Sequence, residues 1–161
     1  MAKKPQKKSL EKSGLFVAAA IFCEKIIREA DNVATLVRVV DKVVVKGTVE
    51  LDTPNIPQPV IQLAAFISFR SRSKRKAAFE LRLRRPSGRP SEKQMRQHID
   101  LNGDWAGGSV SCNVAASIRE AGVHWFDVYL DGHRMATMPL AVEYEKVSPK
   151  ELFRKQGRIR K

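Results

Sequence analysis

The pattern of hydrophobic and polar positions predicts a chain built from short β-strands. Between Gly122 and Glu145 apolar and polar side chains alternate with the period of two that a strand requires. This stretch is interrupted by Asp131-Gly132, and an Asp-Gly pair between apolar runs favours a type I′ hairpin turn. Pro139 has no amide hydrogen to donate, so we expect the returning strand to lie at a sheet edge or to carry a bulge.

Similar alternation recurs earlier in the chain. We predict strands over Thr35–Lys46, Ile61–Arg70, Ala77–Arg85, Gln94–Leu101 and Val110–Ile118. In the first of these segments we expect the core to receive Val37, Val39, Val43 and Val45. Three prolines predict that Gly47–Pro59 is a connection, and the basic stretch Ser71–Lys76 is predicted to be a linker.

Residues 16–28 fit two interpretations. Their apolar positions form a helical stripe, but alternate positions also line one side of a strand. The alanines favour a helix. The turn-like Ala30-Asp31-Asn32 and the valine-rich segment after it favour a strand. We therefore predict a strand over residues 16–28.

Taken together, these segments predict an all-β protein. About eight short strands, with a turn signal roughly every ten residues and little helix, are typical of a β-sandwich. We expect an antiparallel, immunoglobulin-like sandwich of about 7–9 strands over residues 15–145. A basic, flexible arm over residues 1–14 and a basic tail over residues 146–161 are expected to flank it.

Positive charge is concentrated in three regions of this chain of 161 residues. The net charge is +13, with +4 in residues 1–13, +8 in residues 70–89 and +6 in residues 146–161, so the remainder carries −5. Because such an excess opposes compaction, it indicates a polyanionic partner, although solubility is the alternative reason. The candidate polyanion-binding residues are Arg70, Arg72, Lys74, Arg75, Lys76, Arg82, Arg84, Arg85, Arg89, Arg154, Lys155, Arg158 and Arg160.

The type of cation suggests how a polyanion would bind. Arg82 and Arg84 are expected to share the outward face of their strand, and arginine fits phosphate in a bidentate way. We expect contact with a nucleic-acid backbone, weakly sequence-specific and sensitive to salt. Few aromatic residues lie near this hairpin, which argues against stacking on unpaired bases. Alternatively, the cations protect a sheet edge from strand addition. A further alternative is a protein-binding or structural domain of a larger bacterial assembly without nucleic acid, which pairs with a partner or a second copy through a sheet edge or binds an acidic protein surface.

We find no sequence signature of an enzyme, a cofactor site or a metal site. Phosphate-binding glycine motifs, GxSxG and HExxH are absent, and the three histidines have no ligand spacing. Asp100, Asn102 and Asp104 begin like a calcium loop, but Trp105 and Ser111 stand where glycine and glutamate are required. The two cysteines, Cys23 and Cys112, are expected to be small buried hydrophobes or to bridge the two sheets.

The start of the chain imitates a secretory signal. Lysines precede the apolar run Leu15–Cys23, but Glu11 lies before it and no convincing cleavage site follows. No apolar run approaches the ~20 residues needed to cross a bilayer. We therefore expect a cytoplasmic protein without a membrane span.

Two stretches resemble a known family. In Ala20–Asp41 an apolar strand ends in Cys23-Glu24, followed by Arg28-Glu29, a short turn and Leu36-Val37-Arg38-Val39. This order resembles the opening of an uncharacterised family of small bacterial proteins, and Gly122–Val142 resembles its final strands. The resemblance implies an immunoglobulin-like sandwich. It implies no activity, because the family has no assigned function.

Overall fold

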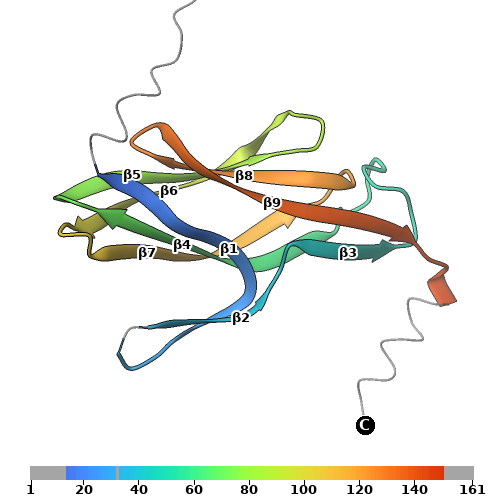
Figure 1. The fold of residues 1–161 in the computed structure, drawn as a ribbon. Helices are drawn as coiled ribbons and strands as arrows, with labels where there is room; N and C mark the ends of the chain where they lie inside the picture. The colour runs from blue at the N-terminus through green and yellow to red at the C-terminus, as the bar shows by residue number, and fades with distance from the viewer. Residues whose placement is uncertain (1–13, 32, 151–161) are drawn as a thin grey trace, which may run out of the picture.

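The computed structural model describes residues 14–31 and 33–150, and this part of the chain forms nine strands in two sheets (Figure 1). One sheet has the order β2-β1-β4-β7 and the other the order β3-β9-β8-β5-β6. All pairs are antiparallel except β3 with β9. The strands are β1 (Leu15–Arg28), β2 (Ala34–Val39), β3 (Lys42–Gly47), β4 (Val60–Ser71), β5 (Lys74–Arg84), β6 (Pro90–Asn102), β7 (Gly107–Ser117), β8 (Gly122–Leu130) and β9 (His133–Lys146). The all-β prediction is confirmed.

Both sheets contribute to one hydrophobic core. Phe22 of β1 meets Phe126 of β8 edge-on, with ring centroids 4.8 Å apart, and Phe69 of β4 meets Phe79 of β5 in the same way at 6.1 Å. Such edge-to-face pairs add to the stabilisation from burial alone. The predicted strand over residues 16–28 is β1, so the helical interpretation of that segment was wrong.

The predicted single strand Thr35–Lys46 is two strands in different sheets. Strand β2 ends at Val39, and β3 begins at Lys42 and pairs with β9 in the opposite sheet. Arg38 has a φ of 50°, and Asp41 interrupts the valine pattern where the chain crosses over. Val45 is buried as expected, but Val39 is 64% exposed. The valine run has the period of a strand on both sides of the crossover, so its pattern could not show that the chain changes sheet.

The Asp131-Gly132 hairpin turn is confirmed. Its φ values are 47° and 78°, positive at both residues as a type I′ turn requires. Of the two alternatives for β9, the position at a sheet edge is wrong, because β9 lies between β3 and β8. Pro139 nevertheless precedes Ala141, where pairing with β3 begins, and the β8–β9 ladder carries the expected irregularity.

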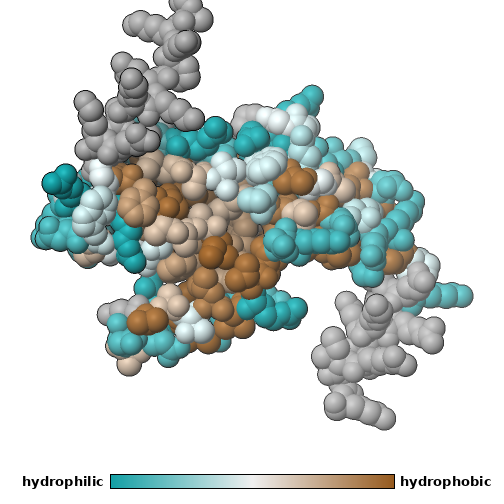
Figure 2. Space-filling view, viewed as in Figure 1, coloured by the Kyte–Doolittle hydropathy of each residue, from teal (hydrophilic) through white to brown (hydrophobic). Residues whose placement is uncertain are grey.

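The outer face of the β2-β1-β4-β7 sheet is partly covered by the chain itself. Figure 1 shows β1 curving so that the β1–β2 hairpin turns back toward β7, and Arg28 Nη2 donates to Ser109 and Ser111 at 3.1 and 3.0 Å. An apolar band follows this curve in Figure 2. Cys23 is fully buried and is the register partner of Ala64. It follows the core residue Phe22 directly, so its side chain points to the opposite face of the sheet and lies outside the core.

Both cysteines are free thiols, so the alternative of a bridge between the sheets was wrong. Burial raises the pKa of Cys23 and of Cys112. Among the described residues, no helix is both long and apolar enough to cross a membrane.

Candidate nucleic-acid interface

The structure separates the predicted polyanion-binding residues into distinct groups. The predicted linker Ser71–Lys76 is much shorter, because β4 ends at Ser71 and β5 already begins at Lys74. The cations of β5 are therefore spread along the whole strand, from Lys74 to Arg84. Four candidates of the tail lie outside the described residues, namely Arg154, Lys155, Arg158 and Arg160.

Arg82 is held by an internal carboxylate. Its Nη2 donates to Glu80 Oε2 at 2.7 Å, and Arg96 Nε donates to the other carboxylate oxygen at 3.0 Å. Glu80 is only 8% exposed although it points away from the core. The bond from Arg82 is the main cause that lowers the pKa of Glu80, and the same bond raises the pKa of Arg82. The guanidinium also lies 4.2 Å from the ring centre of Tyr129.

Arg84 is held in the same manner by Asp127, which is 5% exposed. Nε and Nη2 of Arg84 approach the two carboxylate oxygens at 3.2 and 3.3 Å, and Thr137 Oγ1 donates at 2.7 Å. Burial opposes the charged form of Asp127, but these bonds and the nearby Arg134 outweigh it and lower the pKa. The Arg84 guanidinium also faces Trp125, 5.6 Å from its ring centre.

These contacts make the outer face of β5 and β8 a self-contained charge network. Register pairs Arg82 with Asp127 and Arg84 with Trp125, so cations, carboxylates and rings alternate over two strands. Arg75 is likewise paired with Asp131 in the hairpin turn. An external anion would have to displace these carboxylates, which makes the three arginines poor first contacts for phosphate.

A second group lies at the opposite end of β5. Arg85 and Arg89 flank the β5–β6 turn, closed by a bond from Gly88 N to Arg85 O of 2.8 Å. Ser87 in this turn donates to Glu120 at 2.9 Å. Arg85 and Arg89 form no ion pair among the described residues, but they are far along the strand from the other unpaired cations.

A third group surrounds the end of the molecule where β4 crosses to β5 and β6 turns into β7. Register places Phe16, Arg70 and Gly107 in one row across β1, β4 and β7. The Arg70 guanidinium occupies the space that a side chain at residue 107 would fill, so it lies over β7 at this end. We call this group the aromatic–basic end; it consists of Phe16, Arg70, Arg72, Lys74, Lys76 and Trp105.

Trp105 is presented by an unusual turn. Asp104 and Trp105 have φ values of 50° and 60°, a left-handed conformation that is rare for bulky side chains. Their amides donate to the carbonyls of Arg72 and Ser71, both at 2.9 Å. The indole lies 6.1 Å from the ring of Phe16, and Trp105 is 51% exposed. Two hydrogen bonds to the β4–β5 crossover thus hold a half-exposed tryptophan at the tip.

Gly14 allows the strand β1 to begin directly beneath this tryptophan. Its φ is +57°, and a Cβ there would lie 2.8 Å from the Cβ of Arg72 and 3.3 Å from Trp105. The basic residues 1–13 precede Gly14 in the sequence and carry a net charge of +4.

The four cations of the aromatic–basic end form no ion pair within the described residues. Arg70 and Phe16 lie on the outer side of one sheet, Lys74 and Lys76 on the outer side of the other, and Arg72 lies between them. Two exposed acids, Asp100 and Asp104, are also at this end. With four cations and two acids, the net charge of this end is positive. Its cations form no ion pair among the described residues, whereas Arg82 and Arg84 on the face of β5 do.

Sequence reasoning found the cations of this end but missed its aromatic residues. Trp105 was considered only as the residue that spoils a calcium loop. The available signal was the turn sequence Asn102-Gly103-Asp104 immediately before Trp105, because turns lie at the surface and an adjacent side chain is often exposed. The partner Phe16 is distant in sequence, and only the β1–β4 register brings it near.

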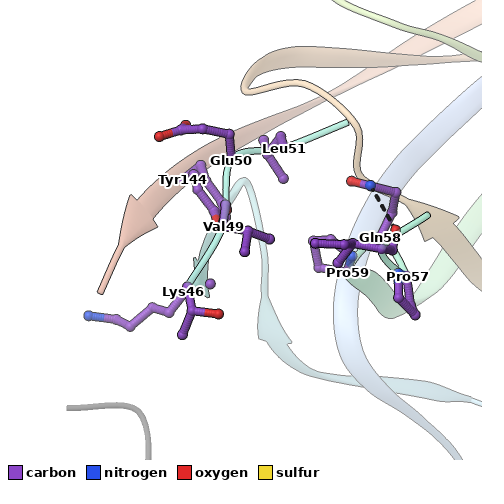
Figure 3. A pocket seen from close by; sticks show the side chains of 11 residues that line it. Lys46, Val49, Glu50, Leu51, Pro57, Gln58, Pro59 and Tyr144 are labelled. Carbon is purple, nitrogen blue, oxygen red and sulfur yellow. Dashed lines mark hydrogen bonds between the residues drawn. The ribbon is translucent and has the colours of Figure 1, made fainter. Parts of the chain in front are cut away.

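A pocket lies elsewhere, at the segment that connects β3 to β4. It has a volume of about 220 Å³ and lies between Lys46–Leu51, Ile56–Pro59 and Tyr144 (Figure 3). The Tyr144 hydroxyl donates to the Val49 carbonyl, so it is already engaged. In the described part of the chain, His, Cys, Asp and Glu side chains form no group of three that could hold a metal ion.

Comparison with known proteins gives distant structural likenesses. No curated protein matches the chain. The alkylpurine DNA glycosylase AlkC of Pseudomonas fluorescens, bound to DNA containing an abasic site analog, is 8% identical with a TM-score of 0.48; the match covers 81% of this chain and 31% of the glycosylase. A β-glucosidase of Listeria innocua is 11% identical with a TM-score of 0.47, over 83% of this chain and 16% of the enzyme. Likenesses at this level transfer no activity to this chain.

The family comparison is more direct. A model described as "Family of unknown function (DUF6941)" matches residues 20–143, from the middle of β1 to near the end of β9. Because this match covers more than half of the chain, the protein belongs to the DUF6941 family of unknown function.

Proposed function

We propose that this chain is a non-enzymatic binding module whose aromatic–basic end holds the phosphate backbone of a nucleic acid. The observation that carries the proposal is the contrast between two sets of cations. Arg82 and Arg84 are bound by buried carboxylates, whereas Arg70, Arg72 and Lys74 have no such partner among the described residues. Unpaired cations on a positively charged protein are the usual footprint of a polyanion site.

The scaffold in this proposal is an immunoglobulin-like sandwich. The order β9-β8-β5 opposite β4-β7 corresponds to the order of the GFC and BE strands in that fold, which supports the assignment. Short crossovers at one end of such a fold bring residues from different strands together. A fixed scaffold of this kind is suited to presenting charges at a loop end.

The chemistry at this end suits backbone contact. Arginine donates to phosphate in a bidentate way, and lysine adds a mobile point charge. The four cations extend from the outer side of one sheet, around the end, to the outer side of the other. They would therefore contact successive phosphates of a nucleic-acid strand that crosses this end. Such contacts carry little sequence information and weaken steeply with salt.

The test is a salt titration of binding to a random-sequence DNA duplex, followed by fluorescence anisotropy. The test variant combines Arg72→Gln, Lys74→Gln and Lys76→Gln. Each lost phosphate contact is expected to reduce the slope of log K against log salt by about 0.9. Loss of all three should therefore make the slope less steep by about 2 to 3.

A matched control removes the same amount of charge at other places. It combines Lys25→Gln, Arg85→Gln and Arg89→Gln, three exposed or half-exposed cations without an ion pair in the described residues. We expect this variant to keep the wild-type salt slope to within about one unit, since it removes no proposed contact. Equal effects of the two variants would mean that net charge, rather than the aromatic–basic end, determines binding.

A second candidate function, protein binding by strand addition, is favoured by β7. This strand forms one edge of its sheet over Gly107–Ser117 and contains neither a charged residue nor a proline, the devices that usually protect an edge. We expect a second copy to pair there if the edge is used. Analytical ultracentrifugation would then show an association that Asn113→Lys abolishes and Asn113→Gln retains; a monomer at all concentrations would count against this function.

A further inference from the structure

We propose that the aromatic–basic end prefers nucleic acid with unpaired bases, because Trp105 and Phe16 provide surfaces on which such bases stack. This inference rests on the proposed function and names the substrate class of the same site. It departs from the expectation drawn from sequence, which found too few aromatic residues near the basic hairpin. The structure adds two aromatic side chains that come from other parts of the chain.

Both aromatic residues keep a large part of their surface open to solvent. Trp105 is 51% exposed and Phe16 is 47% exposed, although their rings contact each other at a tilt of 45°. Exposed apolar side chains are common when they are scattered singly. Two neighbouring rings bordered by unpaired cations are a more specific combination, since base stacking and phosphate contact occur together in single-strand sites.

The turn fixes the backbone at Trp105. Its left-handed backbone is unfavourable for a bulky residue, yet the amides of Asp104 and Trp105 are both bonded to the β4–β5 crossover, and Ala106 N donates to Gly103 O at 2.7 Å. Residues in such conformations persist where their surroundings determine them and are concentrated at binding sites. The indole also contacts the ring of Phe16, and this contact limits the side-chain freedom that Trp105 would lose when a base stacks on it.

The cations lie where a stacked strand would need them. Arg70 is the register partner of Phe16, and the Cβ of Arg72 lies beside Gly14 directly below Trp105. A base on either ring would thus place its phosphate near an arginine. In a duplex the base faces are already stacked on one another, so a duplex would gain the cations but not the rings.

The experiment compares a labelled single strand of about 16 nucleotides, the upper range of single-strand site sizes, with its duplex by fluorescence anisotropy. We expect the wild type to bind the single strand more tightly. Trp105→Ala should weaken single-strand binding about 5- to 150-fold, the equivalent of ~1–3 kcal/mol per stacked base. Its effect on duplex binding should stay within about twofold, because backbone contacts are unchanged.

Two further variants separate stacking from folding. Trp105→Gly removes the ring but accepts the left-handed φ without strain, so a loss of single-strand affinity in this variant cannot come from backbone strain. Trp105→Phe keeps an aromatic face and should retain most of the affinity. Val60→Ala removes an exposed apolar side chain at the distant start of β4 and serves as the matched control.

The outcomes distinguish this inference from the proposed function. Equal affinity for single strand and duplex, or equal losses for both in Trp105→Ala, would overturn the inference and leave phosphate binding intact. An equal loss of affinity for heparin, a polyanion without bases, in Trp105→Ala would also overturn it. Absence of binding to either nucleic acid would overturn the proposed function itself, together with the inference.

Discussion

The change Asp127→Asn tests whether the arginines on the face of β5 are structural. Asn has nearly the same volume as Asp, so the substitution leaves no cavity and removes only the charge. Asp127 is 5% exposed and accepts bonds from Arg84 and from Thr137 at 2.7 to 3.3 Å. The side-chain NH₂ of Asn is a donor and would face the N–H donors of Arg84, so at least one of the two hydrogen bonds would be lost.

The magnitude follows from the burial of the two partners. Breaking a fully buried ion pair typically costs about 3–5 kcal/mol, and one hydrogen bond to a charged group contributes about 1.5–3 kcal/mol. Because the Arg84 side chain is 39% exposed, it remains partly hydrated after the change. We therefore expect a loss of about 2 kcal/mol in the free energy of unfolding, or about 4–8 °C in Tm.

The pH dependence gives a second readout. The folded-state pKa of Asp127 is lowered, so its stabilisation is complete above the ordinary carboxyl pKa of about 3.9 and is lost as the pH falls through the folded-state pKa. Urea unfolding followed by tryptophan fluorescence should show the full difference from wild type near about pH 7 and a narrowing difference below about pH 4.

The matched control for this experiment is Asp100→Asn. Asp100 is an exposed acid with no ion pair among the described residues, so the change should alter stability by less than about 0.5 kcal/mol. The reasoning is refuted if Asp127→Asn costs no more than this control at neutral pH. A difference that stays constant into the acid range would show that the carboxylate charge is not the cause.

Three further expectations concern other parts of the structure. Burial lowers the pKa of His124, so its neutral form adds stability that is complete above about pH 6.5 and is lost as the pH falls; His124→Gln should flatten this part of the stability profile in urea titrations. Gly103→Ala should cost more in Tm than Gly132→Ala, because both glycines have a φ of 78° but only at residue 103 would a Cβ lie 2.6 Å from the backbone of β5. Cys23 and Cys112 should resist a thiol reagent in the native protein, Cys23 more strongly, and both should react after unfolding; fast native labelling of Cys23 would contradict its full burial.

Local pattern was sufficient for much of the fold. Alternation predicted that Arg82 and Arg84 share the outward face of their strand, and the structure confirms this, because Leu81 beside them faces the core. The hairpin turn followed from two residues whose conformational preferences are strong. The membership of an uncharacterised family was also correctly anticipated from short sequence patterns.

Features that depend on long-range register could not be predicted. The burial of Glu80 arises because β5 is placed between β6 and β8, which brings Arg96 and Tyr129 beside it. Alternation alone places residue 80 on the outward face of β5 and says nothing of its burial. The exposure of Trp105 depends on hydrogen bonds to residues about thirty positions earlier, and sequence periodicity carries no information on such contacts.

The most direct test of the account is to map the contact surface by nuclear magnetic resonance. Isotope-labelled protein would be titrated with the same single-stranded oligonucleotide, and amide shifts would be recorded. The account predicts changes at residues 14–16, 70–76 and 103–107, with little change around Arg84 or at the turn between Arg85 and Arg89. Shifts confined to the Arg84 network or to that turn, with residues 103–107 unaffected, would contradict it.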